Sequence, residues 1–209
     1  MKLKKDLQSR KKLNKIRTIN PPAAGRASEH RRVFFVYIDG SNFYHRIKKC
    51  GIEEKHFSYR EFVNCLVGEP VENVKYYIGK VQAKKEDKKG QKLRAAQQAR
   101  FAKLELAGFD IFKGRLLKVE GKYIEKGVDV RLGLDIAVDA IEDSYDEAFL
   151  ISSDGDLAPA VEYAIKKKNK KIIYIAFEGS KFSYHLIQTA SATRFVKTAE
   201  LEKFVLKSE

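Results

Sequence analysis

Two short acidic motifs follow apolar segments of the chain, and their side chains are suited to binding a divalent cation. The first is Asp39-Gly40-Ser41-Asn42, directly after residues 33–38, and the second is Asp154-Gly155-Asp156, after residues 148–153. Carboxylate oxygens are ligands that Mg²⁺ and Mn²⁺ prefer, whereas zinc favours nitrogen and sulfur. Such an ion can activate water and stabilise charge on a phosphoryl group during its transfer.

The same residue types are also ordinary turn formers and helix caps. One loop of this kind would favour that structural role. Two such loops, each after an expected central strand, favour a shared site, because the carboxyl ends of parallel strands meet at one edge of a sheet.

A third group of acids lies in the expected helix over residues 128–142. At about 100° per residue, Asp129 falls within the apolar arc of this helix, so we expect its carboxylate to point inward and to need a partner. Asp135 and Asp139 fall in a polar sector with Arg131, four residues before Asp135. The helical wheel therefore predicts solvated ion pairing for these two acids, with Asp139 at the surface.

Convergence of these acids would itself imply a cation. Two carboxylates about 4 Å apart repel by roughly 4 kcal/mol at an effective dielectric constant of about 20. Three or four carboxylates together would require proton uptake or a bound metal.

The elements that must position these residues alternate along the chain. Short apolar runs predict strands over residues 33–38, 74–81, 109–112, 147–152 and 171–177. Segments of helical length and composition cover residues 41–50, 58–67, 90–107, 128–142 and 156–168. Ser58 and Glu61 have capping-box spacing, and residues 115–124, with Gly121 at the turn, predict a hairpin. The alternation predicts an α/β fold with a mainly parallel sheet.

Composition and charge divide the 209 residues into two parts. Residues 1–32 carry 11 Lys and Arg against two acids and end in a Pro- and Gly-containing stretch, which predicts a flexible basic arm. Residues 33–209 carry 31 basic against 26 acidic residues and form the expected single domain. Such an arm is typical both of an RNA-binding tail and of an extension that increases solubility. The net charge of +14 favours an anionic partner.

The remaining composition excludes several classes of protein. No apolar run is long enough to span a membrane and the N-terminus is not a secretory signal, so we expect a cytoplasmic protein without membrane contact. Cys50 and Cys65 match neither a disulfide framework nor a zinc motif. His45 and His185 lack partners at metal-ligand spacing, so we expect both to be structural.

A basic segment precedes the acidic one. Nine Lys and Arg lie between positions 80 and 103 against two acids, whereas positions 125–156 hold ten acids against two basic residues. The first region is a candidate for holding RNA phosphates beside the acidic site, and the alternative is a solvated helix. The candidate RNA-binding residues are Lys84, Lys85, Lys88, Lys89, Lys92, Arg94 and Arg100. Tyr76, Tyr77 and Phe101 are aromatic candidates for base stacking, although such positions are more often core.

Three motifs in order resemble the NYN domain of LabA-like proteins, which has the PIN-like fold. They are Asp39-Gly40-Ser41-Asn42, then Lys126-Gly127-Val128-Asp129 with Asp135, then Ser152-Ser153-Asp154-Gly155-Asp156, and the likeness spans about residues 33–198. Relatives commonly read Gly-Asp-Ser-Asp-Phe where this chain has Ser153-Asp154-Gly155-Asp156-Leu157. The two carboxylates are kept, but the flanking glycine and aromatic residue are lost.

The resemblance implies a three-layer α/β/α, PIN-like fold and metal-dependent hydrolysis of RNA. Asp39, Asp129, Asp154 and Asp156 would bind Mg²⁺ or Mn²⁺, Asn42 would orient a ligand or water, and the family pattern adds Asp135 to the catalytic residues. A homodimer is a further expectation, because dimers are common in the PIN-like group.

Other acidic sites fit the sequence less well. A haloacid-dehalogenase-like phosphatase generally has a second Asp where this chain has Ser41, and a metal-ion adhesion site needs Ser where it has Phe43. A Toprim-type site expects a leading Glu. The main rival is a non-catalytic RNA-binding or adaptor protein that retains the PIN-like fold.

Overall fold

A computed structural model describes residues 31–83, 85–119 and 122–206, in which one seven-stranded sheet forms the centre. Its strands, in the spatial order β4-β3-β2-β1-β5-β6-β7, are parallel except for the β3–β4 pair. They are β1 Phe34–Asp39, β2 Asn73–Val81, β3 Asp110–Val119, β4 Lys122–Lys126, β5 Glu147–Ile151, β6 Lys171–Phe177 and β7 Ala192–Val196. The arm expected over residues 1–32 lies outside the described residues, apart from Arg31 and Arg32.

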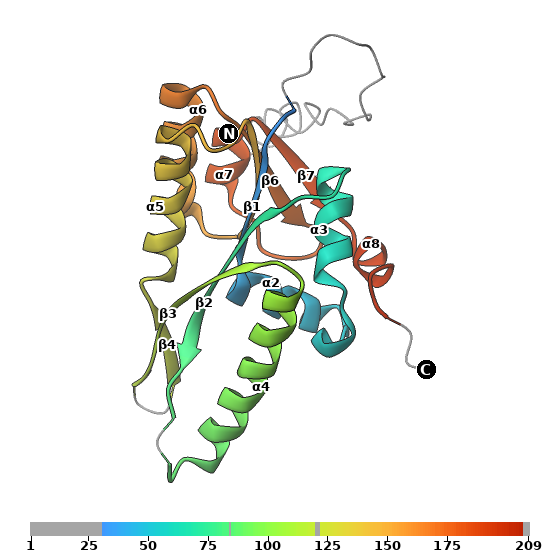
Figure 1. Cartoon of the computed structure of the whole chain (residues 1–209), viewed down its shortest axis with the longest axis vertical. Coiled ribbons are helices and arrows are strands. Elements are labelled where there is room, and N and C mark those ends of the chain that lie inside the picture. Colours follow the sequence, from blue (N-terminus) through green and yellow to red (C-terminus); the bar gives the residue numbers. More distant parts are fainter. Residues whose placement is uncertain (1–30, 84, 120–121, 207–209) are drawn as a thin grey trace, which may run out of the picture.

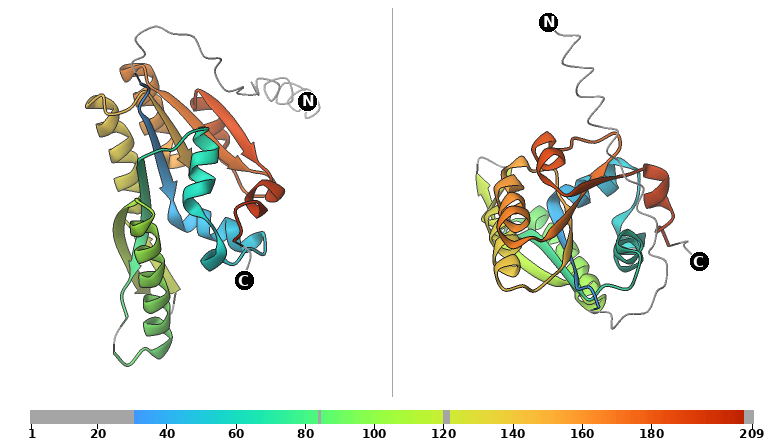
Figure 2. Two further views of the ribbon diagram at one scale, coloured as in Figure 1. Left: turned by 45° about the vertical axis from the view of Figure 1, so that its right-hand side comes forward. Right: turned by 90° about the horizontal axis from the view of Figure 1, so that it is seen from above.

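Helices cover both faces of the sheet (Figures 1 and 2). One core cluster is shared by α2 Gly40–Lys49, α3 Tyr59–Val67, α4 Lys88–Leu106 and α8 Thr198–Glu202, and the other by α5 Val128–Ile141, α6 Ala158–Lys168 and α7 Tyr184–Thr189. Two short 3₁₀ helices are η1 Glu54–His56 and η2 Gly155–Leu157. The arrangement is the expected three-layer α/β/α fold.

The central strand shows why the sheet is packed on both sides. Along β1, Val36 and Ile38 contribute to the core under α2 and α3, while Phe35 and Tyr37 contribute to the core under α5 and α6. Successive side chains of a strand point to opposite faces of the sheet. The sequence of a strand that is covered on both faces is therefore continuously apolar.

The chain reverses its direction across the sheet at β1. From β1 it proceeds through β2 to β3 and β4, and it then returns through α5 to β5 on the other side of β1. Loops that leave neighbouring strands toward opposite faces open a crevice at the carboxyl ends of those strands. This switch point therefore lies between the ends of β1 and β5.

One end of the molecule extends beyond the rest. The strands β2, β3 and β4 and the first turns of α4 project past the end of β1 (Figure 1). Gln97 holds α4 to the free edge of β2, because it accepts a hydrogen bond from the Val81 N–H and donates one to the Gly79 carbonyl, both at 2.8 Å. This places the basic start of α4 near the carboxyl edge of the sheet.

Most expected elements are present, with a few corrections. The hairpin expected over residues 115–124 is the β3–β4 pair, although Gly121 itself lies outside the described residues. The expected capping box is wrong, because the Ser58 side chain makes no cap hydrogen bond to α3. The sequence patterns did not predict β7, α7 or α8. Within the described ranges, no helix has the length and apolar character needed to cross a membrane.

Candidate functional site

The first acidic residue of the site, Asp39, ends β1 and caps α2. Its Oδ1 atom accepts a hydrogen bond from the Asn42 N–H at 3.0 Å, and its Oδ2 atom accepts one from the Asn42 side-chain amide. Asp39 is only 2% exposed. The capping role that the sequence left open is therefore present, in a carboxylate that also lies at the switch point.

The loop after β5 contacts the loop after β1. The Ser152 hydroxyl donates to Asp39 Oδ2 at 3.0 Å, and the Ser153 hydroxyl donates to the Asn42 side-chain oxygen. Asp154 then caps η2 by accepting from the Asp156 N–H at 3.0 Å, and Asp156 is exposed. The structure thus brings both acidic motifs to one place, as expected for carboxyl ends of neighbouring parallel strands.

Asp129 lies in the first turn of α5 with an exposed side chain, and the expectation that it points into the core is wrong. Its neighbour Val128 fills the core position instead. Nearby protein atoms reduce the solvation of the Asp129 carboxylate. This desolvation, followed by the negative charges of Asp39, Asp154, Glu125 and Asp156, raises the pKa of Asp129 to about 6. The helical wheel placed Val128 and Asp129 on one apolar arc, but only Val128 is buried there.

Glu125 of β4 is a site residue that the sequence motifs missed. Its carboxylate accepts a hydrogen bond from the Ser41 hydroxyl at 2.6 Å and another from the Gly79 N–H. A Cβ atom at position 79 would lie 3.0 Å from the Glu125 Cγ atom, so glycine allows the side chain to cross over β2. Its position one residue before Lys126-Gly127-Val128-Asp129 was the available signal.

Two acids of α5 lie apart from this cluster and are buried, which corrects the prediction of solvated positions. Asp135 accepts from the Tyr77 hydroxyl and pairs with Arg131, each at 2.8 Å, so the expected i,i+4 pair is present. Asp139 accepts from Tyr37 and Lys75, each at 2.6 Å. The helical wheel wrongly predicted exposed carboxylates, because it does not include the hydroxyl and ammonium groups of the sheet. These groups bind the carboxylates and allow them to be buried.

The tyrosines in these contacts are core residues rather than exposed stacking platforms. Tyr76 and Tyr77 are fully buried, and Phe101 is 5% exposed. Burial, reinforced by Asp139, holds the pKa of the Tyr37 hydroxyl far above its ordinary value. Burial followed by the charge of Asp135 does the same for the pKa of Tyr77. Both phenols therefore act as hydrogen-bond donors to these carboxylates at neutral pH.

The carboxylates at the carboxyl edge offer oxygen atoms, which are ligands suited to a hard divalent cation. The carboxylates are those of Asp39, Glu125, Asp129, Asp154 and Asp156, and together they hold more negative charge than their neighbours neutralise. Within the described part of the chain, no three Asp, Glu, His or Cys side chains are arranged as a set that could hold a metal ion. Asp39 is instead engaged by Asn42 and Ser152.

The candidate RNA-binding residues divide into two groups. Those near the start of α4 are exposed, and Arg100 is not. The exposed ones are Lys85, Lys88, Lys89, Lys92 and Arg94. The Arg100 Nε atom lies 2.5 Å from the Glu54 Oε1 atom, and this ion pair joins α4 to η1. The Arg100 Cζ atom lies 4.4 Å from the centroid of the Tyr44 ring, which joins α4 to α2. Lys84 lies outside the described residues.

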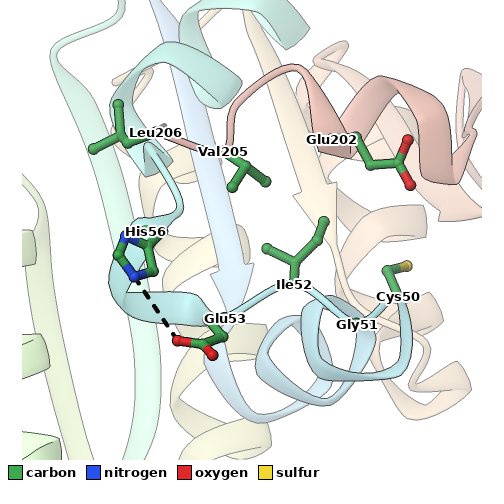
Figure 3. Close-up of a pocket in the computed structure, with 8 residues that line it drawn as sticks. All are labelled: Cys50, Gly51, Ile52, Glu53, His56, Glu202, Val205 and Leu206. Carbon is green, nitrogen blue, oxygen red and sulfur yellow. Dashed lines mark ion pairs between the residues drawn. The ribbon is translucent and has the colours of Figure 1, made fainter. Parts of the chain in front are cut away.

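A cavity of about 380 Å³ lies apart from the carboxylates, between the end of α2 and the segment after α8 (Figure 3). Cys50, Glu53 and Val205 are among its lining residues, and the close-up shows the weak ion pair of Glu53 with His56, at 3.8 Å. Cys50 and Cys65 are free thiols, as expected. None of the clustered carboxylates lines this cavity.

Comparison with known proteins identifies the domain. The model of the NYN domain family matches residues 34–199, which is most of the chain. A crystal structure of a protein of unknown function from Vibrio parahaemolyticus superposes with a TM-score of 0.60 at 20% sequence identity, covering 87% of this chain and 100% of that one. At this identity the likeness concerns the fold alone. None of the curated proteins compared with the chain matches it significantly.

Proposed function

The chain belongs to the NYN domain family, a family of nuclease-like proteins with the PIN-like fold, and from this premise we propose that it is a metal-dependent ribonuclease. The observation that carries the proposal is that the acidic loops after β1 and β5 meet at the switch point, where the Ser152 hydroxyl donates to Asp39, and that the charges of Asp39, Asp154, Glu125 and Asp156 all act on Asp129. A concentration of negative charge is unfavourable without a cation, and it lies where open α/β sheets bind their ligands.

Four residues would bind the ion, namely Asp39, Asp129, Asp154 and Asp156, and Glu125 adds a fifth carboxylate from β4. A bound Mg²⁺ or Mn²⁺ would supply an activated water and stabilise charge on the phosphoryl group. Asn42 holds the Asp39 carboxylate through two hydrogen bonds, while its own side-chain oxygen accepts from Ser153. Its proposed role is therefore to orient Asp39 and a ligand beside it.

Asp135 has a different proposed role. Its carboxylate is occupied by Tyr77 of β2 and by Arg131, and it is absent from the charges that raise the pKa of Asp129. We assign it to positioning, because the contact with Tyr77 fixes α5 on the sheet and thereby fixes Asp129 in the first turn of the same helix. Catalytic loss in an Asp135 variant would then act through Asp129.

RNA is the proposed substrate, and the start of α4 is its proposed path. The exposed lysines Lys85, Lys88, Lys89 and Lys92 lie just before α4 and in its first turns, and this end of α4 projects past the end of β1 (Figure 1). Phosphates bound there would neighbour the acidic site. A cytoplasmic location and a homodimer belong to the same proposal, and sedimentation of the purified protein tests the dimer.

The test is cleavage of end-labelled single-stranded and structured RNA with manganese, magnesium or EDTA. Asp39→Asn and Asp154→Asn remove charge but keep a side chain that caps a helix well, so the fold is retained. Asp110→Asn is the matched control, because Asp110 is exposed at the opposite, amino end of a strand. We expect metal-dependent cutting by the wild type and the control, and its loss in the other two. RNA binding without cleavage in any metal would instead establish the non-catalytic alternative.

A further inference from the structure

A second cavity, of about 320 Å³, adjoins the carboxylates on the side of β5 and β6. It is lined by α2, the ends of β5 and β6, and the segment that follows β6. Asn42, Ser152 and Ser153 line it, and these residues also hold Asp39 or its loop in place. The cavity and the acidic site therefore share a wall.

Arg46 is the buried cation of this cavity. It is only 6% exposed, and its Nη1 and Nη2 atoms donate to Ser180 at 2.9 Å and to Thr198 at 3.0 Å. Its Nε atom is buried without a hydrogen-bond partner, and no ion pair of Arg46 occurs among the described residues. Hydroxyl groups do not neutralise a guanidinium, and an uncompensated buried charge is costly. An anionic ligand would supply both the missing charge and the missing acceptor.

The lysines of the lining carry the same sign of charge as Arg46. Lys49 and Lys181 contribute exposed ammonium groups, and no Asp or Glu lines the cavity. The Arg46 guanidinium also lies 5.6 Å from the centroid of the Phe177 ring, which limits its movement. A positively charged cavity thus lies directly beside a negatively charged site. The carboxylates repel an anion, whereas the cavity attracts it.

We propose that this cavity binds the terminal phosphate monoester of a nucleic-acid strand and so aligns the end of the strand with the carboxylates. A terminal phosphate carries nearly two charges and protrudes from the strand, so it can reach a buried guanidinium that a continuous backbone passes by. The planar donors of arginine match phosphate oxygens. The volume is near the lower limit of about 300 Å³ for ligand sites, which suits a single nucleotide.

The alignment with the carboxylates depends on the proposed ribonuclease function, but the binding of the phosphate does not. Binding is therefore measured in EDTA, where cutting is absent. The probes are short single-stranded RNAs of one sequence that carry a 5′-phosphate, a 3′-phosphate or hydroxyls at both ends. We expect one phosphorylated RNA to bind about tenfold more tightly than the hydroxyl form, which corresponds to about 1.4 kcal/mol. Equal affinity for all three RNAs overturns the proposal.

Adjacent residues of α2 provide matched variants, because Lys49 lines the cavity and Lys48, equally exposed, does not. In Lys49→Ala combined with Lys181→Ala, the preference for phosphorylated RNA should fall toward unity, and in Lys48→Ala it should persist. Arg46→Gln tests the buried cation once its fold has been checked by circular dichroism. If it does not fold, the two lysine substitutions decide the matter.

The outcomes for the two proposals are separable. A preference that survives both the loss of the two lysines and Arg46→Gln overturns the phosphate cavity, whether or not the protein cuts RNA. A protein that prefers phosphorylated RNA but never cuts it supports the cavity and contradicts the ribonuclease. A protein that cuts RNA but binds all three RNAs equally in EDTA supports the ribonuclease and contradicts the cavity.

Discussion

The Ser152 hydroxyl donates to the Asp39 carboxylate at 3.0 Å, and this hydrogen bond joins the ends of β1 and β5. The two strands are paired up to Ile38 and Ile151, so the bond continues the register of the sheet by one residue into the loops. The same hydroxyl oxygen accepts from the Asp154 N–H at 3.1 Å. One serine therefore fixes the relative position of both acidic motifs.

Removing this hydroxyl should loosen the site. Ser152→Ala leaves the buried Asp39 carboxylate with one donor fewer, and we expect a loss of about 1 kcal/mol in the free energy of unfolding. Urea denaturation measures the change. Ser58→Ala is the matched control, because the Ser58 side chain caps nothing and its loss should be nearly neutral. Equal effects of the two substitutions would show that the Ser152 bond does not stabilise the junction.

The fold was predictable where a segment is long, apolar and periodic. Residues 171–177 were expected as a strand and form β6 with those bounds. The small elements after β6 were not predicted, because α7 and α8 are too short to show helical periodicity and β7 is only partly buried. Tertiary contacts determine such segments more than local sequence does.

The site was predictable where strand ends coincide with acidic motifs. Asp39 ends β1 and Asp154 comes shortly after the end of β5, so parallel pairing alone brings the two loops together. The environments of single helix residues were less predictable. A helical wheel shows only the direction in which a side chain leaves the helix. Asp139 is buried because Tyr37 and Lys75 on the sheet donate hydrogen bonds to its carboxylate.

The Asp129 carboxyl should make the metal-free protein less stable as the pH rises. Its pKa in the folded chain is about 6, above the unfolded value near 3.8, so the folded state binds its proton more tightly. This contribution favours folding fully below pH ~4 and is lost as the pH rises through about 6. Asp129→Asn should therefore match the wild type at pH 4 and exceed it in stability at pH 8. Urea unfolding in EDTA checks this, and equal curves at pH 8 would contradict it.

Glu125 should contribute directly to this raised pKa. Glu125→Gln has nearly the same shape, keeps one of the two oxygen acceptors that Ser41 and the Gly79 N–H use, and removes a negative charge, so the pKa of Asp129 should fall toward its ordinary value. Carbon-detected NMR titration of the carboxyl groups measures the shift. Glu142→Gln, an exposed acid near the other end of α5, serves as the control and should leave the titration of Asp129 unchanged. An identical titration in both variants would remove Glu125 from the site.

Buried and exposed ion pairs should differ in their effect on stability. Asp139→Asn leaves Lys75, whose side chain is 16% exposed, without its counter-charge, and we expect a loss of about 2–3 kcal/mol. Tyr37→Phe removes only a hydroxyl donor to the same carboxylate and should cost about 1 kcal/mol. Glu162→Gln, in the exposed pair with Lys166, should cost at most about 0.5 kcal/mol. Chemical denaturation of the three variants gives the order, and a near-neutral Asp139→Asn would show that the buried pair is not stabilising.

The basic start of α4 should contribute RNA affinity through charge rather than through fixed contacts. Reversing the charges of Lys88, Lys89 and Lys92 should weaken binding of single-stranded RNA and lower the slope of log affinity against log salt by about 0.7 for each phosphate that the variant no longer neutralises. Reversal of Lys166 and Lys167 of α6 and of Lys203, which directly follows α8, changes the net charge equally at exposed positions elsewhere. Fluorescence anisotropy at several salt concentrations compares the two variants. A loss of affinity that is the same in both would mean that the RNA responds to net charge, and that α4 does not form a specific path to the carboxylates.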